Sequence, residues 1–266
     1  MQVIHPNGVF NHLQPEDVFI AVDDMGTELG RGYTICQYQP NLYPDRPVNI
    51  YFTMECQPVA QYLLFGALVA RARQLRDLFP GVMARAYTNV APGDTRTKDF
   101  YLHNGFSIDD EENVLALSIP AGDGRIPMSC SVAPVALNTH EEVQAFVSRL
   151  HQNDLAYITP DYVQALQRQP HFLCMALYRT TEMIGEILMG GVGDSCELAA
   201  IYIKPEHRRQ GMGRALLHRS LALMRVEGVR NVSTVIMTRS LPQVRLMDSF
   251  SSRVIATTAV YPYLYL

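Results

Sequence analysis

The stretch "IYIKPEHRRQGMGRAL" (201–216) decides the fold of the second half of this chain. It joins an apolar strand to a segment whose leucines recur at helical spacing from Leu216 onward. The connection places three arginines and two glycines at the start of the helix. Glycines let a ligand approach the backbone, a helix N-terminus offers free amides, and arginines add charged donors. The sequence therefore predicts a binding site for phosphate groups at this junction.

Three phosphate-binding motifs can be compared with the junction. A P-loop requires Gly-Lys-Ser/Thr, but Gly213 is followed by Arg-Ala. A dinucleotide-binding fingerprint requires a third glycine where Leu216 stands, and an acidic residue near position 233, where there is none. The pattern R/Q-x-x-G-x-G/A after a strand ending in V-x-P is matched by residues 208–213, which follow Ile203-Lys-Pro205.

With these residues the second half resembles the GCN5-related N-acetyltransferase (GNAT) family. The resemblance implies that the amides from Arg209 to Arg214 wrap the pyrophosphate of acetyl-CoA, which serves as a co-substrate. It also implies that the preceding strand pairs with the pantetheine arm and polarises the thioester carbonyl, while the next strand splays away to make room. The cofactor-binding residues expected from this resemblance are Ile201, Tyr202, Ile203, Arg208, Arg209, Gln210, Gly211, Met212, Gly213 and Arg214.

The order of predicted elements occurs twice along the chain. Each half has a β-hairpin (17–35 and 171–189), a strand (48–56 and 197–204), a helix (59–78 and 213–227) and a further strand (81–88 and 231–238). Such a long repeat indicates tandem domains. The second half alone begins with two extra helices, predicted from the capping box of Thr139 and Glu142 and from Thr159-Pro160.

The segment "PAGDGRIP" (120–127) separates the halves, because its prolines and glycines are typical of a boundary. We therefore expect an α+β protein of two tandem GNAT-like domains, each a mixed and mostly antiparallel sheet flanked by helices. Residues 1–125 would form a degenerate domain. Residues 126–266 would form the domain that carries the acyl-CoA pyrophosphate loop.

The first half resembles the family at a different motif. "KDFYLHNGF" (98–106) keeps the family's tyrosine, as Tyr101, and its Gly-Phe ending. Its strand-to-helix connection, "ECQPVAQYLLFGA", has neither a basic residue nor a pair of glycines. The second half keeps the phosphate loop but has Met247 in the place of the tyrosine. The second half is therefore expected to bind CoA, and the first half to be largely structural.

Acetyl transfer to an amine needs a base for the amine and a proton for the departing thiolate. Glu197 opens the strand that should face the thioester, where the family often places a water-relayed base; an ordinary strand-end carboxylate is the alternative interpretation. The usual acid is missing at Met247. Tyr261 is the predicted substitute, and the other tyrosines considered for this role are Tyr263, Tyr265 and Tyr101.

Composition limits the classes of function. Hydrophobic residues make up 48% and charged residues 18%, which is typical of a globular protein, and a net charge of -4 argues against a general binder of polyanions. We therefore expect neither a nucleic acid nor a membrane as a partner. Five cysteines without a CxxC pair predict reduced thiols, and no histidine pair has the spacing of metal ligands. The N-terminal residues do not have the pattern of a signal peptide. A cytoplasmic protein without a metal, monomeric or homodimeric, is expected.

The favoured function is that of a transferase that moves an acetyl or short acyl group to an amine of a small molecule or peptide. Glu186, Asp194 and Glu197 could give the acceptor cleft negative charge, or they could be solvated. The alternative is a non-catalytic protein that binds or senses acyl-CoA, which the loss of the tyrosine at Met247 favours.

Overall fold

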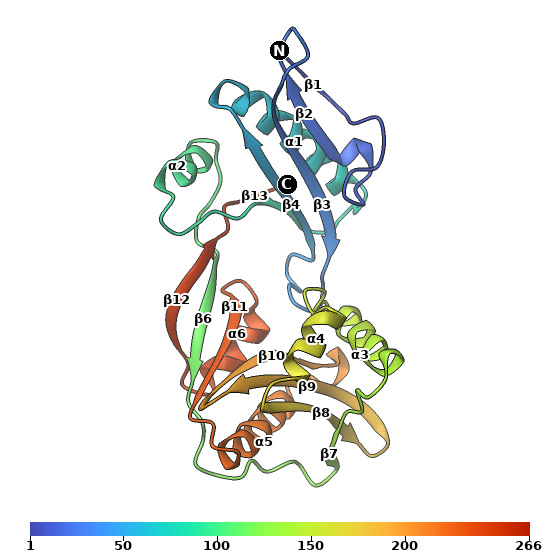
Figure 1. Ribbon diagram of the computed structural model, residues 1–266, viewed down its shortest axis with the longest axis vertical. Coiled ribbons are helices and arrows are strands. Elements are labelled where there is room, and N and C mark those ends of the chain that lie inside the picture. Colours follow the sequence, from blue (N-terminus) through green and yellow to red (C-terminus); the bar gives the residue numbers. More distant parts are fainter. The chain divides into compact units, whose positions relative to one another are not determined.

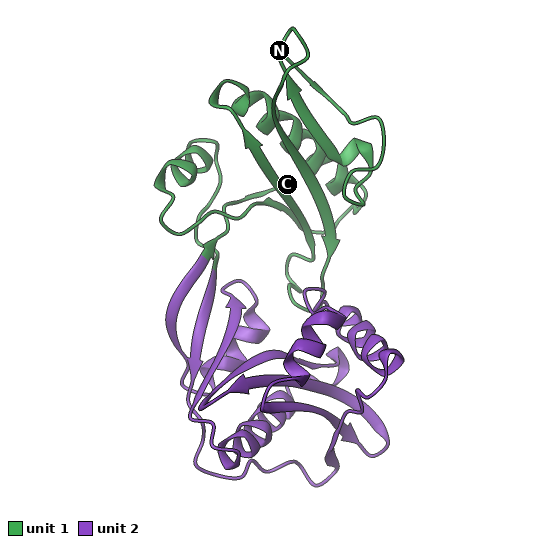
Figure 2. Ribbon diagram, viewed as in Figure 1, with its two compact units in different colours: residues 1–111, 259–266 green, residues 112–258 purple.

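The computed structural model describes residues 1–266, and the chain divides into two compact units (Figure 2). Unit 1 comprises Met1–Glu111 and Ala259–Leu266, and unit 2 comprises Glu112–Thr258. Each unit contains one mixed β-sheet and its own helices, so the predicted α+β class is confirmed. No helix has both the length and the apolar character that crossing a lipid bilayer requires.

Unit 1 is built on a six-stranded sheet in the order β1-β2-β3-β4-β5-β13 (Figure 1). Its strands are β1 (Gln2–Ile4), β2 (Val18–Val22), β3 (Glu28–Tyr38), β4 (Val48–Cys56), β5 (Ala84–Tyr87) and β13 (Tyr263–Tyr265), and its helices are α1 (Gln61–Asp77), α2 (Thr95–His103) and the 3-10 turns η1 (Pro15–Asp17) and η2 (Pro58–Ala60). Helix α1 packs on the sheet because its buried residues recur every three or four positions: Leu64, Leu68, Ala72 and Leu75.

Unit 2 is built on a seven-stranded sheet in the order β12-β6-β11-β10-β9-β8-β7. Its strands are β6 (Glu111–Leu117), β7 (Cys130–Pro134), β8 (His171–Arg179), β9 (Glu182–Val192), β10 (Ser195–Ile203), β11 (Asn231–Met237) and β12 (Arg253–Val260). Its helices are α3 (His140–Gln152), α4 (Pro160–Gln167), α5 (Met212–Val226), α6 (Leu241–Asp248) and the turn η3 (Pro205–His207). The repeated order of hairpin, strand, helix and strand is confirmed, as are the capping box of α3 and the Thr159 cap of α4.

Helices cover both faces of the sheet in unit 2 (Figure 1). Ile187 and Met189 of β9 share a core with Leu216 and Leu217 of α5 and with α6. Glu186, the alternate residue of the same strand, is bonded instead to α3. Because successive side chains of a strand point to opposite faces, α5 and α6 cover one face, and α3 with α4 covers the other.

The two halves of the chain exchange strands. Strand β6, from the first half, lies between β11 and β12 in the sheet of unit 2, and β13, at the end of the chain, pairs with β5 of unit 1. The compact units therefore differ from the predicted ranges 1–125 and 126–266. Alternation of side chains along a strand does not indicate which sheet the strand joins, so this exchange was not predicted.

The proline- and glycine-rich segment 120–127 lies inside unit 2 and packs on α5. Arg225 of α5 donates hydrogen bonds to the carbonyls of Pro120 and Gly122, and Arg219 donates to that of Asp123 at 3.2 Å. These contacts make the segment a connection between β6 and β7 that is held against a helix.

Candidate functional site

The strand-to-helix junction before α5 presents a row of free backbone amides. Gly211 caps the helix with φ +77°, and nothing lies within 4 Å of the position that a Cβ would take there. The amides from Arg209 to Arg214 make no hydrogen bond within the protein, and the first that does is Ala215, whose amide donates to Gly211 O at 3.0 Å. The junction therefore directs several unpaired donors and the positive end of the helix dipole toward one point.

The arginines of the junction are not equivalent. Arg209 and Arg214 are exposed. Arg208 is half-buried, and its Nε donates to Ile203 O at 2.8 Å, so it ties the end of β10 to the loop. Desolvation lowers the pKa of Arg208 below its ordinary value. Arg208 thus shapes the loop, whereas the two exposed arginines are available to a ligand.

A further charged residue lies beside the loop. Arg179, at the end of β8, donates from Nη1 to Gln210 Oε1 at 3.1 Å. The sequence did not identify Arg179, because the residue comes from a hairpin distant in the chain and belongs to no motif.

Strand β10 separates from β11 after a short paired stretch, which confirms the predicted splay. The parallel pairing extends only from Ser195 to Glu197 on β10, although β10 continues to Ile203. Just beyond the paired stretch the Thr234 hydroxyl of β11 donates a hydrogen bond to Leu198 O at 2.9 Å. Beyond Glu197 the edge of β10 has no further pairing with β11, although the carbonyls of Ala199 and Ile203 accept hydrogen bonds from the side chains of Tyr157 and Arg208.

A β-bulge lies where β10 leaves its neighbour. The register with β9 shifts between Leu198 and Ala200. Cys196 and Leu198 before the bulge and Ile201 and Ile203 after it all face the core under α5. The extra residue therefore keeps both ends of the strand in phase with the core and leaves an irregular backbone at the opening of the splay. The sequence did not reveal this bulge.

Glu197 is half-buried at the last paired position of β10, opposite Gly190 of β9 and Ser233 of β11. The other two acidic residues considered for an acceptor cleft do not join it. Glu186 is fully buried, and Asp194 lies in the exposed turn between β9 and β10, where its carbonyl accepts hydrogen bonds from the amides of residues 230 and 231. The expected cleft of three carboxylates is therefore not formed.

Glu186 is instead the centre of a buried network that the sequence did not predict. Arg149 of α3 donates to both oxygens of its carboxylate, at 2.9 and 2.7 Å, and the Tyr202 hydroxyl donates to Oε2 at 2.5 Å. Burial, followed by the charge of Glu186, raises the pKa of the Tyr202 phenol. The network joins α3 to the splayed part of β10, where Tyr202 resides.

Tyr261, the predicted acid, belongs to unit 1, whereas Glu197 and the loop belong to unit 2. Its amide donates to Asp110 O at 2.8 Å, and its ring lies 6.1 Å from that of Tyr87. Tyr101 is only 3% exposed in the core of unit 1. Burial raises the pKa of Tyr101 to about 12.

The corresponding junction of unit 1 is built differently. Pro58 begins the turn η2, and the residue that caps α1 is Ala60 in a helical conformation. Phe52 of β4 is fully buried, with its ring 6.0 Å from each of the rings of Tyr101 and Phe106. This junction has no left-handed glycine and no arginine, which fits the predicted structural role of the first half.

The cysteines do not form a nucleophilic site. All five are free, as expected, and Cys174 and Cys196 are buried. Burial raises the pKa of both thiols, that of Cys196 to about 11, so both are neutral near pH 7.

One group of side chains could hold a metal ion by its geometry. The ligand atoms of Glu182, Glu206 and His207 lie within 4.8 Å of one another. Glu182 is already paired with Lys204 at 3.0 Å and with His207 at 3.4 Å. Its negative charge is therefore balanced by groups of the protein.

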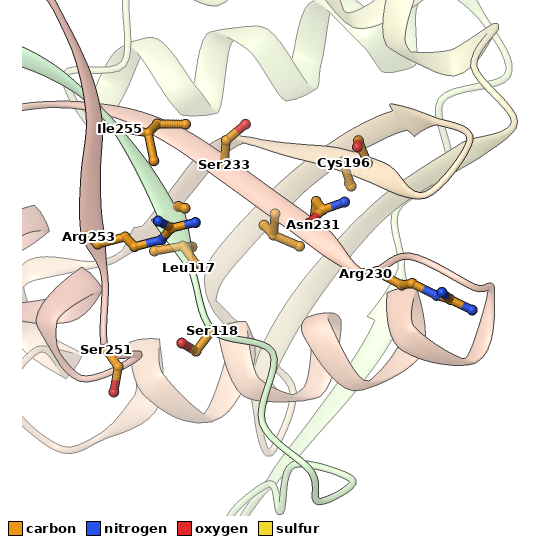
Figure 3. Close-up of a pocket in the computed structure, with 12 residues that line it drawn as sticks. Leu117, Ser118, Cys196, Arg230, Asn231, Ser233, Ser251, Arg253 and Ile255 are labelled. Atoms are coloured by element: carbon orange, nitrogen blue, oxygen red, sulfur yellow. The ribbon is translucent and has the colours of Figure 1, made fainter.

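A cavity of about 470 Å³ lies over the ends of four strands of unit 2 (Figure 3). Ser233, the neighbour of Glu197 across β10 and β11, lines this cavity, and Ser233 and Ile255 point to the same side. Arg230 points away from the other labelled residues. The complete lining is Ala116, Leu117, Ser118, Ser195, Cys196, Arg230, Asn231, Val232, Ser233, Ser251, Arg253 and Ile255.

A comparison with models of known protein families gives a match in the second half of the chain. Residues 138–250 match the model of the acetyltransferase (GNAT) family. No curated protein matches the chain significantly in sequence.

Solved structures are similar to nearly the whole chain. A GCN5-related N-acetyltransferase from Sphaerobacter thermophilus is 13% identical over 96% of this chain and 82% of that chain, with a TM-score of 0.50. A conserved protein from Enterococcus faecalis, described as "Probable N-Acyltransferase", is 12% identical over 92% of this chain and 61% of that chain, with a TM-score of 0.53. A tandem GNAT protein from the clavulanic acid biosynthesis pathway is 12% identical over 93% and 82%, with a TM-score of 0.47. At such low identities the first two similarities establish the fold.

Proposed function

Because residues 138–250 form a domain of the GNAT acetyltransferase family, we propose that this chain transfers an acetyl or short acyl group from CoA to an amine by direct attack. The observation that carries the proposal is that the unpaired edge of a strand runs directly into a row of free backbone amides. The open edge of β10 leads through Ile203 and Arg208 directly into the unpaired amides before α5. A ligand with an extended arm that ends in a pyrophosphate could pair its arm with the strand edge and place its phosphates on the free amides.

The cofactor would be held mainly by the backbone. The splayed edge at Ile201, Tyr202 and Ile203 would pair with the amides of the pantetheine arm, as an added strand does. The amides of residues 209–214 would hold the pyrophosphate, and the exposed side chains of Arg209 and Arg214 would add charge-assisted hydrogen bonds.

In the proposed reaction Glu197 accepts a proton from the acceptor ammonium, directly or through a water. The neutral amine nitrogen then attacks the carbonyl carbon of the thioester. The nitrogen gives up its extra proton to solvent water as the carbon–sulfur bond breaks, and CoA leaves as the thiolate. The thiolate takes a proton from an acid, for which Tyr261 remains the predicted residue. No covalent enzyme intermediate is needed, so positioning supplies much of the rate.

The acceptor is proposed to enter from the cavity beside Ser233. Ser233, which pairs with Glu197 across β10 and β11, is one of the residues that line this cavity. The amine would belong to a small molecule or a peptide. A cytoplasmic location and a monomeric or homodimeric state remain predictions.

A second candidate function is supported by one observation. Met247, at the position of the family's tyrosine, is only 2% exposed and is part of the core of unit 2. A protein that binds acyl-CoA without catalysis would not need an acid at that position. Steady-state assays with a panel of amines separate the two functions, because turnover above hydrolysis excludes a pure sensor.

Gly211→Asp is expected to weaken acetyl-CoA binding by about tenfold to a hundredfold, because its carboxylate would stand among the amides that should receive the pyrophosphate. Calorimetric titration measures the Kd directly. In a thermal unfolding assay, acetyl-CoA at a concentration of about a hundred times its Kd should stabilise the wild-type protein by roughly 2.7 kcal/mol.

Gly228→Asp is the matched control. Gly228 lies just after the other end of α5, has φ +92°, and has nothing within 4 Å of its added Cβ. It should bind acetyl-CoA as the wild type does. Equal Kd values for the two variants would show that the loop before α5 does not bind the pyrophosphate. If the wild-type protein does not bind acetyl-CoA at all, the proposed acetyl transfer is wrong.

A further inference from the structure

The hairpin formed by β8 and β9 contacts the loop before α5 through a side chain of each strand. Arg179, the last residue of β8, donates from Nη1 to Gln210 Oε1 at 3.1 Å. Glu182, the first residue of β9, accepts a hydrogen bond from Lys204 Nζ at 3.0 Å. The Gln210 side chain is also fixed from within the loop, because its Nε2 donates to Glu206 O at 3.3 Å. The hairpin therefore holds the Arg179 guanidinium against the loop at Gln210.

The positive charge of Arg179 is not neutralised by a carboxylate. Arg179 is exposed and forms no ion pair, and its hydrogen bond to Gln210 uses one of its five N–H groups. Its strand partner in the hairpin is Glu182, whose carboxylate is paired with Lys204 at 3.0 Å and lies 3.4 Å from His207. Because Lys204 balances the charge of Glu182, Arg179 keeps its own charge and four donors for a ligand at the loop.

The order of the strands indicates which part of a ligand Arg179 would meet. The sheet runs β11-β10-β9-β8, so β8 lies on the side of β10 opposite the splay. In the proposed function the pantetheine arm lies along the splayed edge of β10, and the pyrophosphate lies on the amides of residues 209–214. A ligand that continues past the loop toward β8 reaches Arg179 with the part that follows its pyrophosphate. In CoA this part is an adenosine whose ribose carries a phosphate on its 3′ oxygen.

We propose that Arg179 is a cofactor-binding residue that binds the 3′-phosphate of CoA. An arginine suits a phosphate because its planar fork can donate two parallel hydrogen bonds to the phosphate oxygens. The pyrophosphate already has the loop amides with Arg209 and Arg214 beside it, so the separate cation at Arg179 matches the separate phosphate of the nucleotide. This inference rests on the proposed function, because it requires that the loop before α5 binds CoA.

The test compares two ligands that differ only in this phosphate, acetyl-CoA and 3′-dephospho-acetyl-CoA. Calorimetric titration at low salt measures the Kd of each ligand for the wild type and for Arg179→Met, which removes the charge and keeps an unbranched side chain. We expect the wild type to bind acetyl-CoA about threefold to tenfold more tightly than the dephospho ligand, as an exposed charge-assisted pair allows. In Arg179→Met the Kd for acetyl-CoA should rise by the same factor, whereas the Kd for the dephospho ligand should stay nearly unchanged.

Arg168→Met is the matched control. Arg168 is exposed at the end of α4, on the face of the sheet opposite α5, and its loss removes the same charge from unit 2. Both Kd values should equal those of the wild type, which separates the effect of net charge from that of Arg179. Added salt should reduce the difference between the two ligands in the wild type, because exposed charges are screened.

Equal Kd values of the two ligands for the wild type would overturn the inference, and this measurement needs no variant. An equal loss of affinity for both ligands in Arg179→Met would also overturn it, because Arg179 would then act only through the loop or the pyrophosphate. A wild-type protein that binds neither ligand would contradict the proposed function together with the inference. A protein that binds acetyl-CoA but acetylates no amine would contradict the proposed transfer alone, and the comparison of the two ligands would still decide the role of Arg179.

Discussion

Glu197→Gln is expected to lower kcat/KM for amine acetylation by about a hundredfold to ten-thousandfold, the range typical of a lost general base. The amide keeps the shape of the side chain but cannot accept the proton of the ammonium group. The Kd for acetyl-CoA should stay unchanged, because the proposed contacts with the cofactor lie on the splayed part of β10 and on the loop. Initial rates across a range of acceptor concentrations and a calorimetric titration of acetyl-CoA measure the two quantities.

Asp194→Asn supplies the control for this experiment. Asp194 is an exposed carboxylate in the turn just before β10, three positions from Glu197, and it also loses one negative charge in the variant. Activity close to that of the wild type is expected. If Glu197→Gln kept the wild-type kcat/KM, the base would have to be another group, and the strand-end interpretation of Glu197 would stand.

The features that were predicted correctly are those encoded by residues that are close together in the chain. Strand β4 spans the predicted residues 48–56, and α5 begins and ends within one residue of the predicted helix 213–227. The cap of α3 at Thr139 was predicted because a capping box is a local pattern with a fixed spacing. The prediction of a phosphate loop rests on the same kind of signal, since its glycines and arginines follow one another in the chain.

The features that were not predicted depend on a contact with a residue or strand that is distant in the sequence. The strand exchange of β6 and β13 depends on which sheet offers a free edge, and no local signal encodes that choice. The role assigned to Glu186 was wrong for the same reason: its partner, Arg149, stands 37 positions away on α3.

The buried network of Glu186 leads to the largest expected effect on stability. Arg149→Met should lower the free energy of unfolding of unit 2 by about 3–5 kcal/mol, the range for breaking a buried ion pair. Glu186 is completely buried, so it would keep a charge with neither water nor its bidentate partner to stabilise it. Urea unfolding followed by circular dichroism measures the change, analysed as separate transitions if the units unfold independently.

Two variants isolate the cause of this loss. Arg225→Met removes an arginine whose side chain is 33% exposed, close to the 31% of Arg149, but whose ion-pair partner Asp123 is 92% exposed, so its effect should be much smaller. Adding Glu186→Gln to Arg149→Met should recover part of the stability, because a buried amide is less costly than a buried charge. Equal losses for the two arginine variants would contradict this account.

Since Glu186 also accepts a hydrogen bond from the hydroxyl of Tyr202, Arg149→Met should in addition loosen the splayed part of β10 and weaken acetyl-CoA binding. Arg225→Met should not weaken acetyl-CoA binding.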